Sequence, residues 1–338
     1  MQLYAGIDLH SNNSFMVISQ ADDTVVYQRR LPNDINSIVS ELKQYQDQIE
    51  GVVVESTYNW YWLVDGLQTA GYKVHLANTT AIKQYSGLKH TNDKKDARWL
   101  ARLLQLNILP TGYIYPKEER AIRDLLRKRC QLVQQRTLHL LSLKTLVERN
   151  TSIQLSGSSI KKLTSQELKD ILPEDNIFLA AESNLKIMQY IDKQMMVVEK
   201  TVLKQSRPND VYKRLLTVDG IGKILALTIM LETGDIKRFS KVGNYASYCR
   251  CVDSKKISND KKKGENNRKN GNQYLCWAYV EAANFAIRYN STIKKYYQRK
   301  KEKTKQIIAI KTIAHKLSRA CFYIMKDGVD FDVEKSFR

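Results

Sequence analysis

The chain has 338 residues, a length typical of two or three domains. Hydrophobic residues make up 43% and charged residues 27%, which excludes a collagen, a disordered acidic tail and a disulfide-rich miniprotein. The five cysteines are scattered and contain no CxxC pair, so neither disulfides nor a structural zinc site is expected. No apolar run approaches the length of a membrane span, and the first residues lack the layout of a signal peptide. A cytoplasmic protein without membrane contact is therefore predicted.

The formal net charge of +20 predicts a polyanionic partner, most often nucleic acid. Residues 1–110 carry 10 basic and 11 acidic side chains, a net charge of −1. Residues 111–206 carry 16 and 11, a net charge of +5, and residues 207–338 carry 29 and 13, a net charge of +16. The excess lies in the last third, which predicts a division of labour between a neutral amino-terminal part and a phosphate-binding carboxyl-terminal part.

The first third of the chain alternates between strand and helix patterns, which predicts a mixed α/β layer domain over residues 1–112. Short apolar or β-branched runs predict strands, and apolar residues at helical spacing predict helices. The expected strands are 3–7, 15–19, 24–27, 52–54 and 73–77, and the expected helices are 35–48, 59–71 and 93–107.

The rest of the chain is predicted to be all-α. Residues 113–206 read as a helical arm, with a long heptad-like helix at 117–150, a break at 156–159 and helices between 165 and 205. This pattern fits an antiparallel helical pair or a coiled coil for oligomerisation. Residues 207–338 form a third, basic domain with helices at about 272–288 and 304–325, whereas residues 253–272 are poor in apolar residues and predict a loop or exposed element.

Four carboxylates are placed where they can converge. Asp8 and Glu55 each end a predicted buried strand, at the sheet edge where α/β sites usually lie. Asp93 and Asp96 are three residues apart and project from one face of a helix. Like charges brought together need a cation, and Mg²⁺ or Mn²⁺ prefers such oxygen ligands. The alternative is structural, with Asp93 capping its helix.

A glycine motif in the last third has the spacing of a helix-hairpin-helix. Gly220 and Gly222 permit a tight turn and are followed by Lys223. The helix expected at 224–231 begins with exposed N–H groups, which attract a phosphate. Sequence-independent contact with double-stranded DNA or with RNA follows from this interpretation. An ordinary turn between two helices is the alternative.

The segment after this motif is strongly basic. It also contains two serines, Ser254 and Ser258, and a serine among cations near a phosphate can act as a nucleophile. A merely solvated loop is the alternative. The basic side chains are Lys255, Lys256, Lys261, Lys262, Lys263, Arg268 and Lys269.

Together these motifs resemble a known family, because they occur in the family's order over about residues 3 to 325. The chain is similar to the DEDD transposases of the insertion-sequence-110 group, which are relatives of the Piv-type DNA invertases. The motifs are Gly6-Ile7-Asp8, Glu55-Ser56-Thr57, Asp93-Lys94-Lys95-Asp96-Ala97-Arg98, the hairpin at 218–223 and Gly264 with Lys269-Asn270-Gly271-Asn272.

The resemblance implies a RuvC-like domain of RNase H fold, a coiled-coil arm and a carboxyl-terminal transposase domain. It implies Mg²⁺ held by Asp8, Glu55, Asp93 and Asp96, and a serine that forms a phosphoserine link to DNA. Ser258 fits the family's spacing better than Ser254. It further implies a bacterial or archaeal protein at the nucleoid, a homo-oligomer from dimer to tetramer with composite sites, and a structured guide RNA.

The sequence departs from the family at two places, and three functions stay open. Tyr58 stands where many members have glycine, and the loop after Ser258 reads Asn-Asp-Lys-Lys-Lys before Gly264. The first function is a site-specific DNA recombinase that uses the acidic tetrad and Ser258. The second is a metal-dependent, structure-selective nuclease with water as the nucleophile. The third is a non-catalytic nucleic-acid-binding protein.

Overall fold

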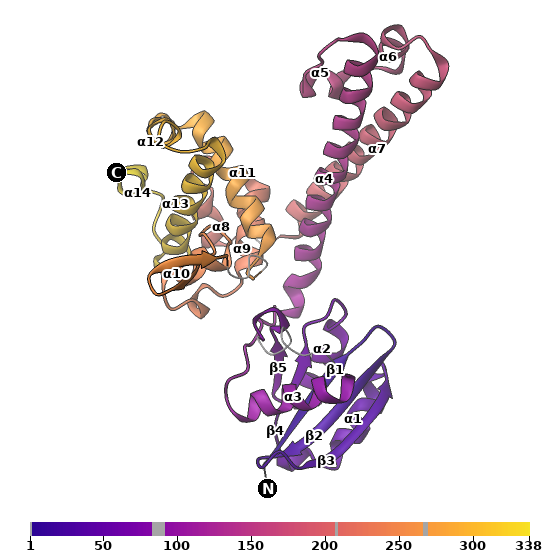
Figure 1. Cartoon of the computed structure of the whole chain (residues 1–338), viewed down its shortest axis with the longest axis vertical. Coiled ribbons are helices and arrows are strands. Elements are labelled where there is room, and N and C mark those ends of the chain that lie inside the picture. The colour runs from indigo at the N-terminus through magenta and orange to yellow at the C-terminus, as the bar shows by residue number, and fades with distance from the viewer. Residues whose placement is uncertain (1, 83–91, 207–208, 266–269) are drawn as a thin grey trace. The chain divides into compact units, whose positions relative to one another are not determined.

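The computed structural model describes residues 2–82, 92–206, 209–265 and 270–338. The chain divides into two compact units, Met1–Lys117 and Glu118–Arg338. The first unit contains a five-stranded sheet with helices, and the second consists mainly of helices (Figure 1). Within the described ranges, no helix is long and apolar enough to cross a membrane.

The sheet of the first unit has the strand order β3-β2-β1-β4-β5. The first three strands pair antiparallel, and β4 and β5 run parallel to β1. This arrangement confirms the predicted mixed α/β architecture. The strands are β1 (Leu3–Leu9), β2 (Asn13–Gln20), β3 (Val25–Pro32), β4 (Ile49–Glu55) and β5 (Val74–Ala77).

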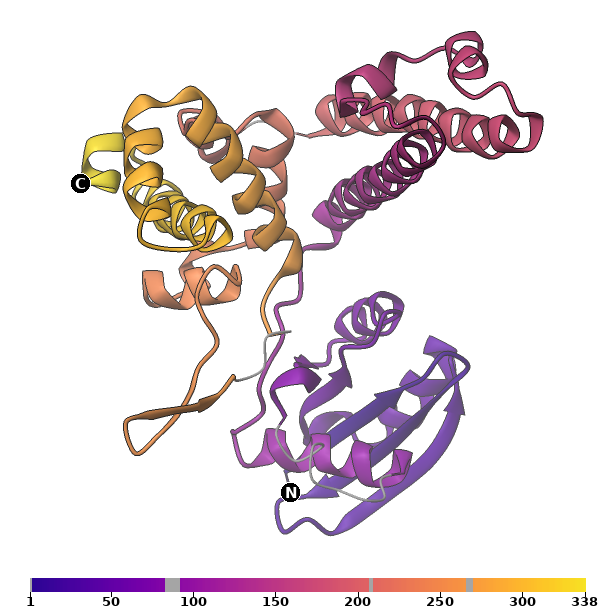
Figure 2. The same ribbon diagram turned by 45° about the horizontal axis from the view of Figure 1, so that its top comes forward.

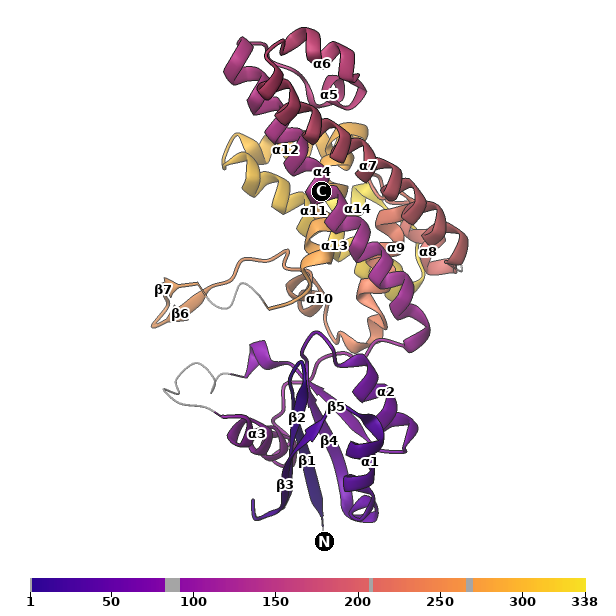
Figure 3. The same cartoon turned by 90° about the vertical axis from the view of Figure 1, so that its right-hand side faces the viewer.

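Helices cover both faces of this sheet (Figure 3). One face carries Ile7 and Val54 and packs against the first two helices, and the other carries Val53 and packs against the third. Successive residues of a strand point to opposite faces, so Gly6 and Asp8 of β1 lie on the face of the third helix. The helices are α1 (Ile35–Lys43), α2 (Tyr61–Thr69) and α3 (Asp93–Gln105).

A long antiparallel helix pair begins the second unit (Figure 1). Arg129 lies 2.7 Å from Glu199 and Arg136 lies 2.7 Å from Asp192, a pairing in which one helix runs up as the other runs down. The structure thus contains the helical pair that the apolar spacing predicts. The helices of the pair are α4 (Lys117–Thr151) and α7 (Asp175–Gln205), joined by α5 (Gly157–Lys162) and α6 (Ser165–Ile171).

The remaining helices enclose a second core. Tyr245 and Tyr279 are fully buried in it, and their hydroxyl oxygens lie 2.7 Å apart. The predicted helical character of this part is confirmed. The elements are α8 (Asp210–Leu215), α9 (Lys223–Thr233), α10 (Val242–Tyr248), β6 (Lys256–Ser258), β7 (Lys261–Gly264), α11 (Gln273–Tyr289), α12 (Ser291–Lys301), α13 (Gln306–Asp327) and α14 (Val333–Phe337).

Two segments have more regular structure than the sequence pattern specifies. The predicted break at 156–159 holds the start of α5, because the side chain of Ser156 caps that helix by accepting from the amide of Ser159. The basic stretch, predicted to be a loop or exposed element, contains an exposed antiparallel hairpin, β6–β7, which extends away from the helices of its unit (Figures 2 and 3). Asn259 and Asp260 turn the chain there with positive φ angles of 51° and 56°.

Candidate active site

Gly6 determines how closely helix α3 approaches the sheet. A Cβ atom at this position would lie 2.0 Å from the carbonyl oxygen of Ala97 and 2.8 Å from the amide nitrogen of Ala101. Glycine therefore allows the backbone of α3 to rest directly on β1. The contact brings the first turn of α3 toward the end of β1, where Asp8 lies on the same face of the sheet.

Substitution of Gly6 by alanine should destabilise the first unit by about 1–3 kcal/mol, because the backbone of α3 must move to admit a methyl group. Denaturant unfolding measures this effect. Gly112→Ala is the matched control, since a Cβ atom there meets the nearest atom of Leu76 at an ordinary 3.5 Å. An equal loss of stability in both variants would contradict the close approach at Gly6.

The structure brings the four predicted carboxylates together. Asp8 is only 3% exposed, and its side chain shares a hydrogen bond with Glu55 at the end of the neighbouring parallel strand. Asp96 lies near enough to Asp8 for their charges to repel, and Asp93 lies one helical turn before it. The cluster joins the ends of two strands and the start of one helix, as the sequence predicts.

Asn92, and not Asp93, caps helix α3. The side-chain oxygen of Asn92 accepts a hydrogen bond of 2.9 Å from the amide of Lys95. The carboxylate of Asp93 instead forms an ion pair with Arg30 of β3. The structural alternative for Asp93, a helix cap, is therefore wrong, and its charge is directed toward the cluster.

Burial and mutual repulsion perturb the carboxylates. Burial, together with the hydrogen bond and charge of Asp8 and the charge of Asp96, raises the pKa of Glu55 to about 8. Burial and the charge of Asp8 also raise the pKa of Asp96. The hydrogen bond from Arg30 lowers the pKa of Asp93 and keeps that group ionised. A proton or a cation is thus needed to relieve the repulsion at Glu55.

His10 is a member of the cluster that sequence reasoning missed. Its Nε2 atom lies 3.3 Å from the Asp8 carboxylate and 3.2 Å from the Asp93 carboxylate, close enough to form an ion pair with either when the imidazole is protonated. Asn33 and Asn59 hold its backbone by donating to the carbonyl oxygen at 2.9 and 3.0 Å. The signal in the sequence was the Asp-x-His spacing, which places both side chains on one side of an extended chain.

These donors fit a hard divalent cation. Asp8, His10 and Asp93 each offer a ligand atom within 4.8 Å of the others, and Glu55 and Asp96 add carboxylates beside them. The carboxylate oxygens suit Mg²⁺ or Mn²⁺, whereas an imidazole is a softer donor than Mg²⁺ prefers. A cation would also neutralise the repulsion that raises the pKa of Glu55.

Ser258 ends strand β6 at the tip of the hairpin, where it is exposed. Lys256 lies two residues before it on the same strand side, and Lys261 pairs with it across the turn. The base of the loop is closed, because Arg250 donates to the carbonyl oxygen of Gly271 at 2.9 and 3.1 Å. The hydroxyl of Ser258 is thus presented among cations on a loop with a fixed base.

Ser254 has a different environment. Its Oγ atom is buried and has no hydrogen-bond partner in the described residues. A nucleophile must reach a phosphorus atom on DNA, and an exposed hydroxyl meets this requirement whereas a buried one does not. The structure therefore favours Ser258 of the two candidates.

Comparison with protein families matches both parts of the chain. A model described as a transposase, of the DEDD type of IS110, matches residues 5–150. A model described as transposase of the IS116/IS110/IS902 family matches residues 212–298. The chain belongs to the IS110 family of transposases. A search of curated proteins found no match.

The glycine motif of this transposase lies between α8 and α9. Gly220 has a φ of 90°, and a Cβ atom there would lie 2.3 Å from the carbonyl oxygen of Ala282 in α11. Gly220 thus serves the packing of two helices. Gly222 and Lys223 at the start of α9 are exposed, with open space around Gly222. Phosphate binding by the motif stays a prediction, and these two residues are the part of it that a phosphate can reach.

Four of the lysines predicted to bind phosphate lie on and beside the hairpin of the transposase. Lys255, Lys256, Lys261 and Lys263 are all exposed, which suits phosphate contact. Arg268, Lys269 and the side chain of Lys262 lie outside the described part of the chain. Their role in binding nucleic acid stays a prediction.

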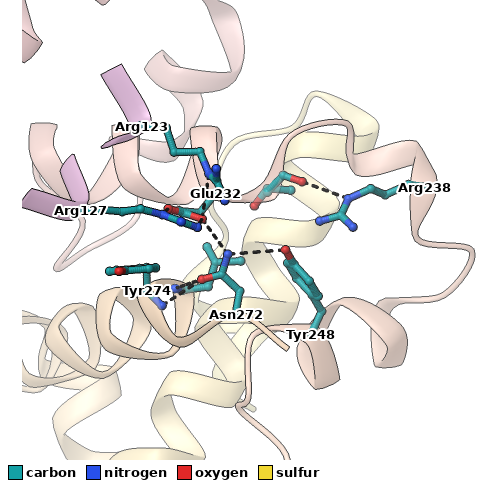
Figure 4. A network of polar contacts seen from close by, with 9 residues as sticks. Arg123, Arg127, Glu232, Arg238, Tyr248, Asn272 and Tyr274 are labelled. Carbon is teal, nitrogen blue, oxygen red and sulfur yellow. Dashed lines mark hydrogen bonds and ion pairs between the residues drawn. The ribbon is translucent and has the colours of Figure 1, made fainter. Parts of the chain in front are cut away.

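A buried ion-pair network ties helix α4 to the transposase core (Figure 4). Glu232 of α9 is 1% exposed and contacts Arg123 at 3.1 Å and Arg127 at 2.5 and 2.9 Å. Asn272 also donates to Glu232 at 2.7 Å while it caps α11. These contacts lower the pKa of Glu232 although burial opposes its charge. The sequence analysis missed this network, whose one local signal is an acidic residue in an apolar helix.

Proposed function

We propose that this transposase cleaves and rejoins DNA strands through a covalent link to Ser258, assisted by a divalent cation at the acidic cluster. The observation that carries the proposal is the convergence of Asp8, Glu55 and Asp96, with the pKa of Glu55 raised to about 8. Perturbed carboxylates at a strand edge are typical of catalytic rather than structural groups. The strand order of the sheet also supports assignment of the first unit to the RuvC-like RNase H fold.

Asp8, Glu55, Asp93 and Asp96 would hold the cation, with His10 as an additional ligand. When bound, it would stabilise the negative charge that develops on the phosphate and on the attacking and leaving oxygens. Arg30 keeps Asp93 ionised and oriented, and the amides of Asn33 and Asn59 fix the backbone that carries His10.

The serine step exchanges one ester for another. The Oγ atom of Ser258 attacks phosphorus, a phosphoserine ester forms, and a bond from phosphorus to a DNA oxygen breaks. The proton lost from the serine balances the proton gained by the leaving hydroxyl. Attack by the hydroxyl of another strand then reverses the step and releases the serine. Lys256 and Lys261 beside Ser258 favour its ionised form and the charged phosphate.

Substitution of Ser258 by alanine should abolish a covalent protein–DNA adduct while DNA binding persists. Trapping on a nicked suicide substrate, followed by denaturing electrophoresis, measures the adduct. Ser254→Ala is the matched control and should still form it. An adduct in Ser258→Ala that disappears in Ser254→Ala would transfer the role to Ser254. Metal-dependent nicking without any adduct would support the nuclease alternative.

We also propose that copies of the chain associate through their arms. Four apolar side chains share one face of α7, namely Leu179, Ile187, Tyr190 and Val197, and they are 44–63% exposed. An apolar stripe of this kind favours contact with another helix. Light scattering should report a dimer to tetramer, and Tyr190→Glu should shift it toward the monomer. A wild-type chain that is monomeric with and without nucleic acid would contradict the arm contact.

A structured guide RNA is the last part of the proposal. It is supported by the family resemblance and by the net charge of +20. RNA that copurifies with the chain after treatment with DNase should have one dominant sequence. A heterogeneous mixture of cellular RNA would count against a guide.

A further inference from the structure

A cavity of about 600 Å³ lies between helices α4 and α11 of the second unit. Helix α11 contributes the rings of Tyr274 and Trp277, and α4 contributes the cations Arg127 and Lys128 together with Asp124. The volume falls within the range of about 300–1,000 Å³ that is usual for small-ligand sites. None of the residues assigned above to the cation, to the nucleophile or to phosphate binding lines this cavity.

One wall of the cavity is held rigidly by the network of Figure 4. Glu232, which is 1% exposed, fixes the guanidinium of Arg127 through two hydrogen bonds. That guanidinium lies over the ring of Tyr274, 4.5 Å from its centroid. The Glu232 carboxylate thus positions the Arg127 guanidinium against the Tyr274 ring before any ligand binds. Less side-chain entropy is then lost on binding.

The other walls combine stacking and hydrogen-bonding groups. Trp277 is half-buried against the core, and Arg129 lies 5.9 Å from its ring centroid. The side-chain amides of Gln134 and Gln273 also line the cavity, and an amide can donate to and accept from the edge of a base. Aromatic rings, cations and amides together match the base and phosphate of a nucleotide.

We propose that this cavity binds an unpaired nucleotide of a nucleic-acid strand. The base would stack on Trp277, and its phosphate would face Lys128. A base inside a duplex is stacked on both sides and cannot enter a side pocket, so the ligand is single-stranded. Unpaired DNA and an unpaired segment of RNA share this chemistry. The site goes beyond the function proposed above and depends neither on Ser258 nor on the acidic cluster.

Binding of labelled oligonucleotides to the full chain tests the site. Asp8→Asn serves as the background that leaves the strands intact, and the probes are single-stranded DNA, single-stranded RNA and duplex DNA of one sequence. Gln134→Glu adds a negative charge at the cavity and should weaken single-strand binding several-fold. Gln135→Glu is the matched control, because it makes the same charge change on the next, exposed residue of α4 and lies outside the cavity lining.

Stacking has its own test. Trp277→Ala should weaken single-strand binding roughly 5- to 150-fold, the equivalent of one lost base–aromatic stack, whereas Trp277→Phe should retain most of the affinity. Tyr289→Ala is the control on the same helix, since Tyr289 is 70% exposed and stacks on Phe285. Quenching of tryptophan fluorescence by the bound strand should also decrease in Trp277→Phe.

The three probes and the two pairs of variant and control distinguish a nucleotide site from nonspecific binding. A selective effect on the DNA strand or on the RNA strand supports the site and identifies the source of the nucleotide. Equal losses in Gln134→Glu and Gln135→Glu, equal losses in Trp277→Ala and Tyr289→Ala, or equal effects on duplex and single strands would overturn it. Should Trp277→Ala fail to fold, the comparison of Gln134→Glu with its control Gln135→Glu tests the site without it, because both residues are exposed.

Discussion

Replacement of Asp8 by asparagine should reduce DNA strand cleavage about 10³-fold while DNA binding is retained. Asp8 is buried, shares a hydrogen bond with Glu55 and faces the charge of Asp96. Asp8 is therefore the carboxylate that interacts with both Glu55 and Asp96. The amide preserves the shape of the side chain but removes the charge that a cation needs. Cleavage of a labelled substrate with Mg²⁺ or Mn²⁺ measures the loss.

Asp8→Asn should lower cleavage activity but raise the thermal stability of the metal-free protein. Without metal, removal of the buried charge of Asp8 from a cluster of repelling carboxylates should raise the melting temperature. Addition of Mg²⁺ or Mn²⁺ should stabilise the wild-type protein but leave Asp8→Asn nearly unchanged. Asp47→Asn, at an exposed site of the same unit, is the control that should behave like the wild type. Full cleavage by Asp8→Asn would remove the acidic cluster from the mechanism.

Replacement of Glu232 by alanine should destabilise the second unit by about 3–5 kcal/mol, because it removes a buried carboxylate that two arginines share. The side chain of Arg123 is only 6% exposed, and Arg127 loses two hydrogen bonds. Asn272 loses a partner as well, which loosens the start of α11. Denaturant unfolding of the full chain measures the effect.

Glu199→Ala is the matched control for this substitution. Glu199 also pairs with an arginine of α4, at 2.7 Å from Arg129, but its side chain is 32% exposed. Water can replace the lost partner there, so the expected loss is about 0–1 kcal/mol. Similar unfolding midpoints for the two variants would show that the buried network contributes no more than a surface ion pair.

The apolar strands and helices of the fold were predictable because their residues face a core. Val52, Val53 and Val54 are fully buried and identify β4 on their own. The end of β3 was not predictable, since Gln28, Arg29 and Arg30 are exposed on an edge strand and show no apolar alternation. Helix α12 is mostly basic and polar, and the hairpin β6–β7 depends on its turn rather than on burial. Neither has a hydrophobic period to detect.

The candidate site also has a part that was predictable from the sequence and a part that was not. Its carboxylates stand at strand ends and at a helical spacing, which are local signals in the sequence. The partners of these carboxylates are not local, because Arg30 meets Asp93 only when β3 lies at its place in the sheet. Glu232 illustrates the limit, since its arginines lie more than 100 positions earlier in the chain. Such pairs are determined by tertiary packing and leave no spacing that a single sequence reveals.

Hydrogen bonds at the base of the basic loop fix both ends of the segment that carries the β6–β7 hairpin. The bonds from Arg250 to Gly271 and from Asn272 to Tyr248 pin both ends to the helical core. Ser258 lies eight positions after Arg250, and a fully extended chain of that length spans at most about 29 Å. Ser258, the proposed nucleophile, therefore lies within about that distance of Arg250, which would keep its local concentration high at a DNA strand bound by the same unit. In the mechanism proposed above, the tip follows a strand that moves during exchange while the core that carries it stays folded.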